Sequence, residues 1–338
     1  MTRFILIVQF LIFVNTEILA QCCGAGSGSP IASGVSQGVL MQKQLEFNAS
    51  YQFNNSTKFI HHDTEAKDFL DRYYSQYGYL RVGYGLTKEL TMSVETGYWF
   101  NKTQIGLDKR DTLSSHGFGD LILFPRYDVY NHQGLTSRTE ITVGMGWKIP
   151  IGSHLDSTHF EGEFYDYTIR NPITVQTSSG ANDFIFYGFF FHGWPLQYFR
   201  VFGNVLYIRK GWNNVGEKQG DYFSMSFFAS KTVFEKLALI LQVKGETIAQ
   251  MQVNKELYQN VYFIDDVIWQ STGSKKVFIT PQVSYSMKDL TFFTSAEFPV
   301  YQYVNGIQTA SQLQVTAGLS YRINFKRKPA ETETPKAQ

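Results

Sequence analysis

Two groups of residues have side chains that can bind divalent cations. His61, His62 and Asp63 are consecutive. The second group consists of His154, Asp156, His159, Glu161, Glu163 and Asp166. Imidazole and carboxylate groups are suitable ligands, but neither spacing matches that of a closed metal site. Both groups fall in segments that we expect to be outer loops. We therefore interpret them as solvated loops, or as surfaces that meet a partner, and predict no metal and no cofactor.

The sequence offers little for covalent catalysis. A lipase built on a β-barrel would need a serine beside a histidine, oriented by an asparagine or aspartate. Ser114, Ser115 and His116 are adjacent in sequence, but adjacent side chains on a strand point to opposite faces. We find no Ser/His pairing along the alternating segments described next. We predict that the protein is not an enzyme, and a barrel-type hydrolase is the least favoured alternative.

Most ionisable residues instead belong to segments in which polar and apolar side chains alternate. The clearest segment is the last one, where Leu313 and Phe325 bound the apolar set and Gln312 and Asn324 bound the polar set. A period of two over this length predicts a β-strand with one polar and one apolar face. The length also suits the roughly 9–11 residues that a tilted strand needs to cross a bilayer.

The connections between the alternating segments are long and short in turn. The long ones cover residues 54–72, 101–116, 151–181, 213–220, 249–273 and 302–310, and the short ones lie near residues 87–88, 132–137, 195–197, 232–236 and 288–289. Outer-membrane barrels have long loops outside and short turns in the periplasm, and a chain that starts and ends in the periplasm needs an even number of strands. We predict an all-β fold, a transmembrane antiparallel β-barrel of about twelve strands (ten to fourteen are allowed), over residues 43–325.

One segment does not alternate. Residues 183–194 are apolar at successive positions, so the pattern does not predict which of them face inward. A soluble β-sandwich is the competing fold, but its strands usually have about 5–6 residues, and it gives no reason for links that alternate in length. Aromatic residues make up 16% of the chain and charged residues 17%, with a formal net charge of +1. This composition suits an aromatic-rich β-surface and gives no case for nucleic acid as a partner.

The two ends of the chain differ from the rest. Residues 1–20 have the positive start, apolar core and small residue at Ala20 of a cleaved signal peptide, although a membrane anchor is an alternative. Residues 21–42 are rich in glycine and serine, which predicts a periplasmic leader or a plug folded into the lumen. Cys22 and Cys23 stand beside the expected cleavage site; lipidation of Cys22, a metal or redox pair, and an oxidised pair all remain open. The charged residues 326–338 predict a disordered tail.

If the apolar faces meet lipid, the polar faces line the lumen. The candidate lumen-lining residues are Arg81, Glu95, Trp99, Asp120, Arg126, Asp128, Glu140, Lys148, Arg200, Lys244, Glu246, Glu297 and Arg322. Their signs nearly balance, whereas a strongly ion-selective pore would carry one sign in excess. Such charges can instead pair across a narrow lumen and hold it nearly shut. Aromatic residues on the same faces, Tyr73, Tyr77, Tyr79 and Tyr130, are candidate stacking surfaces for a solute.

The end of the last segment resembles the C-terminal signal of outer-membrane barrels. The matching residues are Gly318, Tyr321, Ile323 and Phe325. This resemblance implies recognition by a barrel-assembly machinery and residence among outer-membrane lipids, after removal of the signal peptide. It implies nothing about the solute.

Three further stretches resemble a family of gram-negative outer-membrane barrels named for the MetA pathway of phenol degradation and grouped with generic transporters. They are GFGDLILFPRYDVY (Gly117–Tyr130), ITVGMGWKIPIG (Ile141–Gly152) and SSGANDFIFYG (Ser178–Gly188). The leader CCGAGSGSPIASGVSQGVL is also similar to the leaders of such barrels. The resemblance implies uptake of aromatic or other hydrophobic small molecules.

Together these observations favour a passive channel or transporter for small, aromatic or hydrophobic solutes. A non-conducting scaffold that binds a partner through its loops or leader is the alternative. The sequence specifies neither the solute nor the oligomeric state.

Overall fold

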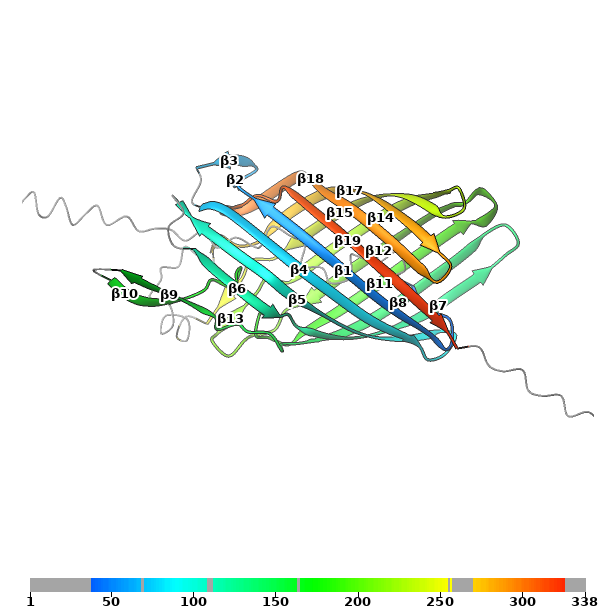
Figure 1. Cartoon of the computed structure of the whole chain (residues 1–338), viewed down its shortest axis with the longest axis horizontal. Coiled ribbons are helices and arrows are strands. Elements are labelled where there is room, and N and C mark those ends of the chain that lie inside the picture. The colour runs from blue at the N-terminus through cyan, green and yellow to red at the C-terminus, as the bar shows by residue number, and fades with distance from the viewer. Residues whose placement is uncertain are drawn as a thin grey trace, which may run out of the picture.

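Twelve long strands form one closed antiparallel barrel in the computed structural model (Figure 1). The structure describes residues 38–67, 70–107, 112–162, 165–254, 256 and 270–325. The expected signal peptide, most of the expected leader with Cys22 and Cys23, and the expected tail lie outside these residues. The barrel strands are β1 (Gln44–Ser56), β4 (Leu70–Gly85), β5 (Leu90–Gly106), β7 (Leu121–Gln133), β8 (Arg138–Ile149), β11 (Asp183–Trp194), β12 (Phe199–Arg209), β14 (Tyr222–Val233), β15 (Leu237–Ile248), β17 (Ser274–Met287), β18 (Leu290–Thr309) and β19 (Leu313–Asn324).

Each barrel strand pairs with the next one along the chain, and the first pairs with the last. The pairing of β1 with β19 runs from Gln44↔Asn324 to Asn55↔Leu313. It leaves the barrel without a free edge, which is how an antiparallel sheet satisfies all its backbone groups. The predicted all-β barrel and its strand number are therefore confirmed. Within the described residues, no helix is long and apolar enough to cross a membrane.

The connections lie at the two ends of the barrel according to their length (Figure 1). Short turns follow β4, β7, β11, β14 and β17, and the turn after β11 contains the 3-10 helix η2 (Pro195–Gln197). The opposite end, at the left of Figure 1, carries short extra strands. These are β2 (Phe59–His62), β3 (Thr64–Ala66), β6 (Leu113–Phe118), β9 (Ser157–Gly162), β10 (Tyr165–Arg170), β13 (Glu217–Lys218) and β16 (Gln252–Val253). By the rule for outer-membrane barrels, this end is the outer mouth and the short-turn end is the inner mouth.

One predicted loop is wrong. The sequence pattern predicts a long connection at residues 302–310, but β18 continues to Thr309. The extension is possible because Val304–Thr309 pairs with β2, with an irregularity between Val304 and Ile307. The partner strand supplies hydrogen bonds that a loop would take from water. Only residues 310–312 then separate β18 from β19.

The barrel has its polar side chains inside and its apolar side chains outside. On β1, Glu46 and Asn48 are buried, whereas Phe47 and Tyr51 are exposed. This is the reverse of a soluble fold and the arrangement expected of strands that face lipid. On β11 the structure shows which residues face inward: Asp183 and Tyr187 are buried, whereas Phe184 is exposed.

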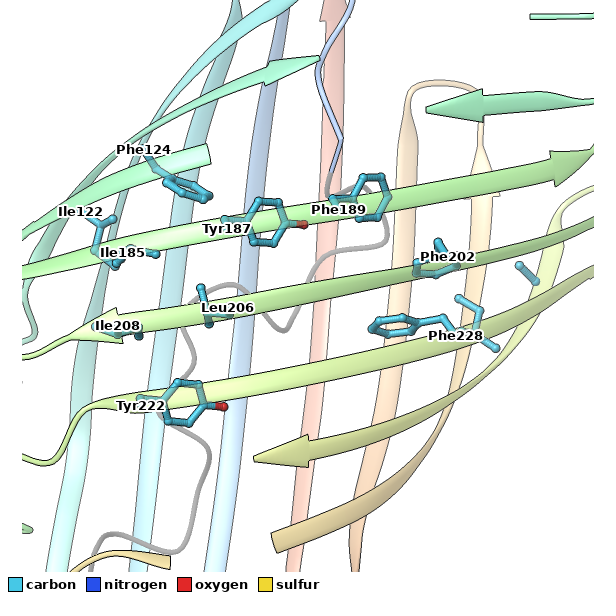
Figure 2. Close-up of a cluster of buried hydrophobic side chains, with 12 residues drawn as sticks. Ile122, Phe124, Ile185, Tyr187, Phe189, Phe202, Leu206, Ile208, Tyr222 and Phe228 are labelled. Carbon is cyan, nitrogen blue, oxygen red and sulfur yellow. The ribbon is translucent and has the colours of Figure 1, made fainter. Parts of the chain in front are cut away.

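Part of the inner surface is nevertheless apolar, which explains why residues 183–194 show no alternation. Figure 2 shows this apolar wall on neighbouring strands. Its buried members are Ile122, Phe124, Ile185, Tyr187, Phe189, Phe202, Leu206, Ile208, Tyr222, Phe228, Ala238 and Ile240. The rings of Phe202 and Phe228 stack with their centroids 4.4 Å apart. Arg200 is the only predicted lumen residue of β12, yet Phe202, Leu206 and Ile208 lie on the same face at a period of two, so the wall follows the alternation although the sequence pattern does not single out its apolar members.

The two faces predict opposite tolerance to charge. Val243 is exposed on the outer face near the middle of β15, and its neighbour Gln242 is buried on the inner face. We expect Val243→Arg to destabilise the barrel by about 2–4 kcal/mol, because it places a charge in the middle of the bilayer. Gln242→Arg should cost less, since its side chain points away from lipid into the lumen, where Gln242 contacts the hydroxyl of Ser226. Denaturant unfolding of both variants in lipid vesicles checks this, and an equal or reversed loss would contradict the assigned faces.

Candidate functional site

A segment after β10 folds into the barrel at the outer mouth. Residues 171–179, here called the inward segment, are all buried although six of them are polar. The amide of Asn171 donates hydrogen bonds to the carbonyl of Ser114 and to the hydroxyl of Ser115, both at 3.0 Å. On the other side, the Asn213 amide donates to the carbonyl of Ser179 at 3.1 Å. The segment is thus tied to two parts of the barrel and covers the lumen between them.

Gln176 holds the inward segment in shape. Its side chain is 1% exposed. The amide nitrogen donates to the carbonyls of Asp156 (2.9 Å) and Asn171 (2.7 Å), and the amide oxygen accepts from the backbone N–H of Asp156 at 3.0 Å. Buried polar groups are stable only when they are paired in this way. The polar character of the segment is therefore a means of fixing it, and a loop exposed to water would not need these contacts.

A cavity of about 260 Å³ lies inside the barrel next to the inward segment. One part of its lining is aromatic or aliphatic, with Tyr73, Tyr77, Trp99, Ile122, Ile208 and Tyr222 from five strands. Another part carries charge, with Lys102, Asp120, Lys148 and Lys210. Tyr77 and Trp99 face each other with ring centroids 4.4 Å apart. We call this cavity the chamber; its lining combines aromatic surface with a few charged groups, as small-molecule sites do.

Two buried aspartates neutralise two of the lysines at the chamber. Lys148 forms ion pairs with Asp120 and with Asp183, the latter at 3.2 Å from nitrogen to oxygen. Lys210 pairs with the same oxygen of Asp183 at 3.0 Å. Asp183 also accepts a hydrogen bond from the backbone N–H of Gly211. This network joins β8, β11 and the residue before β7 to the start of the loop after β12.

Other charged side chains inside the barrel form pairs that do not line the chamber. Glu46 binds Arg81 and Arg322, each at 2.7 Å. The hydroxyl of Tyr79 donates to Glu95 at 2.6 Å. Further pairs are Lys244–Glu297 at 2.7 Å, Lys244–Glu246 at 3.5 Å and Arg138–Glu140 at 2.9 Å. These pairs place charges of both signs next to one another inside the barrel.

The structure places the thirteen candidate lumen residues on the inner face of the barrel. Buried members are Arg81, Glu95, Asp120, Arg126, Asp128, Glu140, Lys244, Glu246 and Glu297, and partly buried ones are Trp99, Lys148, Arg200 and Arg322. Only Trp99, Asp120 and Lys148 line the chamber. Tyr73 and Tyr77 also line it, but Tyr130 does not belong with them: it is 49% exposed, because an irregularity after Asp128 turns it outward.

Sequence reasoning missed Lys102 and Asp183. Lys102 follows Trp99 across a register shift in the pairing of β5 with β6, so strict alternation does not place it. Asp183 is the first residue of segment 183–194, for which the sequence pattern does not predict which side chains face inward. The motif Gly-x-x-Asp at Gly180–Asp183 was a usable signal for Asp183, whereas only the partner strand reveals the irregularity at Lys102.

Where the structure describes them, the candidate metal ligands form contacts in pairs only, such as His159 with Asp166 at 3.5 Å. The described residues contain no group of three or more His, Cys, Asp or Glu side chains that could hold a metal ion. Ser115 is buried whereas His116 is exposed on the same strand, β6. Their side chains therefore point to opposite faces, as expected for neighbours on a strand.

The inner mouth contains the described end of the expected leader. Lys43 donates its backbone N–H to Gly85 at the rim. The N–H of Leu40, whose side chain is 3% exposed, donates to the hydroxyl of Thr91 at 2.7 Å, and that of Val39 donates to Glu140 at 3.2 Å. Residues 39–43 thus run from the rim at β4 across the mouth to β8.

The chain is similar in fold to one solved outer-membrane barrel and aligns at lower scores with others. An outer membrane channel from Pseudomonas putida F1 aligns with a TM-score of 0.61 and 11% identity, over 86% of this chain and 99% of that chain. The NanC porin gives 0.41 and 11% (82% and 100%), and the translocator domain of the autotransporter NalP from Neisseria meningitidis gives 0.43 and 10% (87% and 92%). No protein-family model and no curated protein sequence matches the chain. At these identities the likeness concerns the fold of outer-membrane barrels alone.

The hydrogen bonds of Gln176 predict a more open barrel when they are removed. Gln176→Ala eliminates three hydrogen bonds, each worth about 1 kcal/mol, so the inward segment should leave its position more often. We expect a higher mean conductance of the refolded protein in a planar bilayer. Gln133→Ala, at an exposed site of β7 near the inner mouth, is the matched control. Unchanged conductance for Gln176→Ala would show that the inward segment does not limit passage.

The contacts at the inner mouth make a separate prediction. A refolded chain that begins at Met41 lacks the bonds from Val39 to Glu140 and from Leu40 to Thr91. We expect this chain to conduct more than one that begins at Gln21, because backbone that crosses the mouth has been removed. Paired single-channel recordings check the difference. Equal currents would mean that these residues do not narrow the path.

Proposed function

We propose that the protein is a passive channel or transporter of the outer membrane for small solutes that carry an aromatic or other hydrophobic part. The observation that carries the proposal is the chamber, because aromatic and aliphatic side chains from many strands converge there. The size also supports it: a cavity of about 150 Å³ holds benzene, so the chamber suits a single substituted ring. The resemblance of Gly117–Tyr130 and two other stretches to barrels of the phenol-degradation family points to the same class of solute.

The apolar wall supports a path away from the chamber. Ile122, Ile208 and Tyr222 belong both to the chamber and to the wall. From them the wall continues along β11, β12 and β14 to Phe189 and Phe228, toward the inner mouth (Figure 2). A hydrophobic solute that leaves the chamber would meet buried aromatic surface instead of paired charges. Partly apolar walls let such a solute move without being held by one strong contact.

A non-conducting scaffold is the second candidate. It is favoured by the buried polar contacts of the inward segment at one mouth and by the Leu40 contacts at the other. In that case the loops of the outer mouth would bind a partner. Residence in the outer membrane and assembly through Gly318, Tyr321, Ile323 and Phe325 belong to both proposals. The absence of enzymatic activity stays a prediction.

Uptake into vesicles tests the first proposal against the second. Benzenesulfonate and benzyltrimethylammonium carry permanent charges and cross protein-free lipid slowly, and benzyl alcohol can be followed by binding. We expect saturable entry or binding of at least one of them, together with steps of current in a planar bilayer. Lipid vesicles without protein, and vesicles with heat-unfolded protein, are the controls. A folded barrel that binds none of the three, passes none and gives no current would overturn the channel and leave the scaffold.

A further inference from the structure

We infer that the chamber accepts small aromatic anions, such as aromatic carboxylates or sulfonates, and that Lys102 is the residue that binds their charge. The inference rests on the proposed function and narrows its solute class. It starts from the surroundings of Lys102, which lies on β5 beside the irregularity after Trp99.

Lys102 is partly buried, and its ammonium group has only uncharged contacts among the described residues. It donates a hydrogen bond to the backbone carbonyl of Gln176 at 2.6 Å and lies 4.7 Å from the centre of the Trp99 ring. No carboxylate of the described chain lies within ion-pair distance of it. An ammonium removed from water without a counter-charge is costly, and a bound anion relieves that cost.

The two carboxylates beside the chamber form their ion pairs with other lysines. Asp120 is engaged by Lys148, and Asp183 is shared by Lys148 and Lys210. Three lysines thus stand against two carboxylates, and Lys102 is the lysine that has no ion pair among the described residues. The chamber should therefore repel an organic cation and attract an anion.

The aromatic lining adds the second part of the specificity. Tyr73, Tyr77 and Trp99 present ring surface in the same cavity as Lys102. Aromatic rings gain from contact with other rings beyond the area that they bury. An anion with a ring should therefore bind better than an aliphatic anion of similar size. A neutral ring would keep the ring contacts but lose the charge-assisted hydrogen bond.

Calorimetric titration of the full-length folded barrel in detergent tests this order. The probes are benzenesulfonate, benzoate, cyclohexanecarboxylate, benzyl alcohol and benzyltrimethylammonium. We expect the two aromatic anions to bind at least about tenfold more tightly than benzyl alcohol, as a charge-assisted hydrogen bond of 1.5 kcal/mol or more implies. Cyclohexanecarboxylate should be weaker than benzoate, and the cation weakest.

Substitutions of Lys102 test whether this residue causes the preference for aromatic anions. Lys102→Met should weaken benzoate about tenfold and change benzyl alcohol little, and Lys102→Arg should retain benzoate binding. The control is Lys231→Met, which removes an exposed lysine bonded to Gln197 at the opposite end of the barrel. Heat-modifiability on gels establishes that each variant is folded. If Lys102→Met does not fold, the order in which the unaltered protein and Lys102→Arg bind the five probes still tests the anion site.

The outcomes separate this inference from the function on which it rests. If benzyl alcohol binds as tightly as benzoate, or if Lys102→Met leaves benzoate binding unchanged, the anion site is overturned while a hydrophobic channel stands. If no probe binds and none passes, both proposals fall. Tight, Lys102-dependent binding of aromatic anions supports the inference even where conductance is low.

Discussion

Backbone hydrogen bonding without water is the constraint on which the rest of this structure depends. Inside a bilayer an unpaired amide or carbonyl group is costly, so strands cross only as a closed barrel. Here the closure is made between β1 and β19, in one continuous register from Gln44↔Asn324 to Asn55↔Leu313. Closure also sorts the side chains, because successive residues of every strand then point to lipid or to the lumen.

The inside that results carries two kinds of side chain. Ionic side chains are spread over most strands of the barrel, and between β1, β4 and β19 Glu46 binds both Arg81 and Arg322. Aromatic and aliphatic side chains gather on β11, β12 and β14. Buried ion pairs contribute little net stability because both partners lose water, so their value here is more in filling the lumen with fixed shape than in holding the barrel together. At the chamber the two kinds meet, and a solute with both a ring and a polar group can contact each.

Alternation alone predicted much of this arrangement and failed where a residue depends on a distant partner. The inward positions of Glu95, Lys148 and Glu297 follow from their place in polar faces, and the barrel follows from the length and number of such faces. The end of β18 could not be predicted, because it is set by pairing with β2. The inward face of Lys102 depends on an irregularity that only the neighbouring strand reveals.

The position of the inward segment also depends on distant partners, so the sequence pattern does not predict it. Its sequence reads as a polar loop, and its burial arises from contacts with Ser114 and Asn213, which are far away along the chain. Trp99, Asp120 and Lys148 line the chamber, but the sequence pattern does not predict the segment that covers it.

The pairing of the first strand with the last also sets the order of events during folding. Gln44 meets Asn324, so the closing contacts join residues separated by nearly the whole described chain. Contacts of such separation form slowly, because a long loop must be closed before any of them contributes. Hairpins such as β4–β5 can form early, but the sheet keeps two open edges until β19 arrives. Until that moment the protein exposes two rows of unpaired backbone groups, and this interval is the time at which it is most prone to aggregate through its edges.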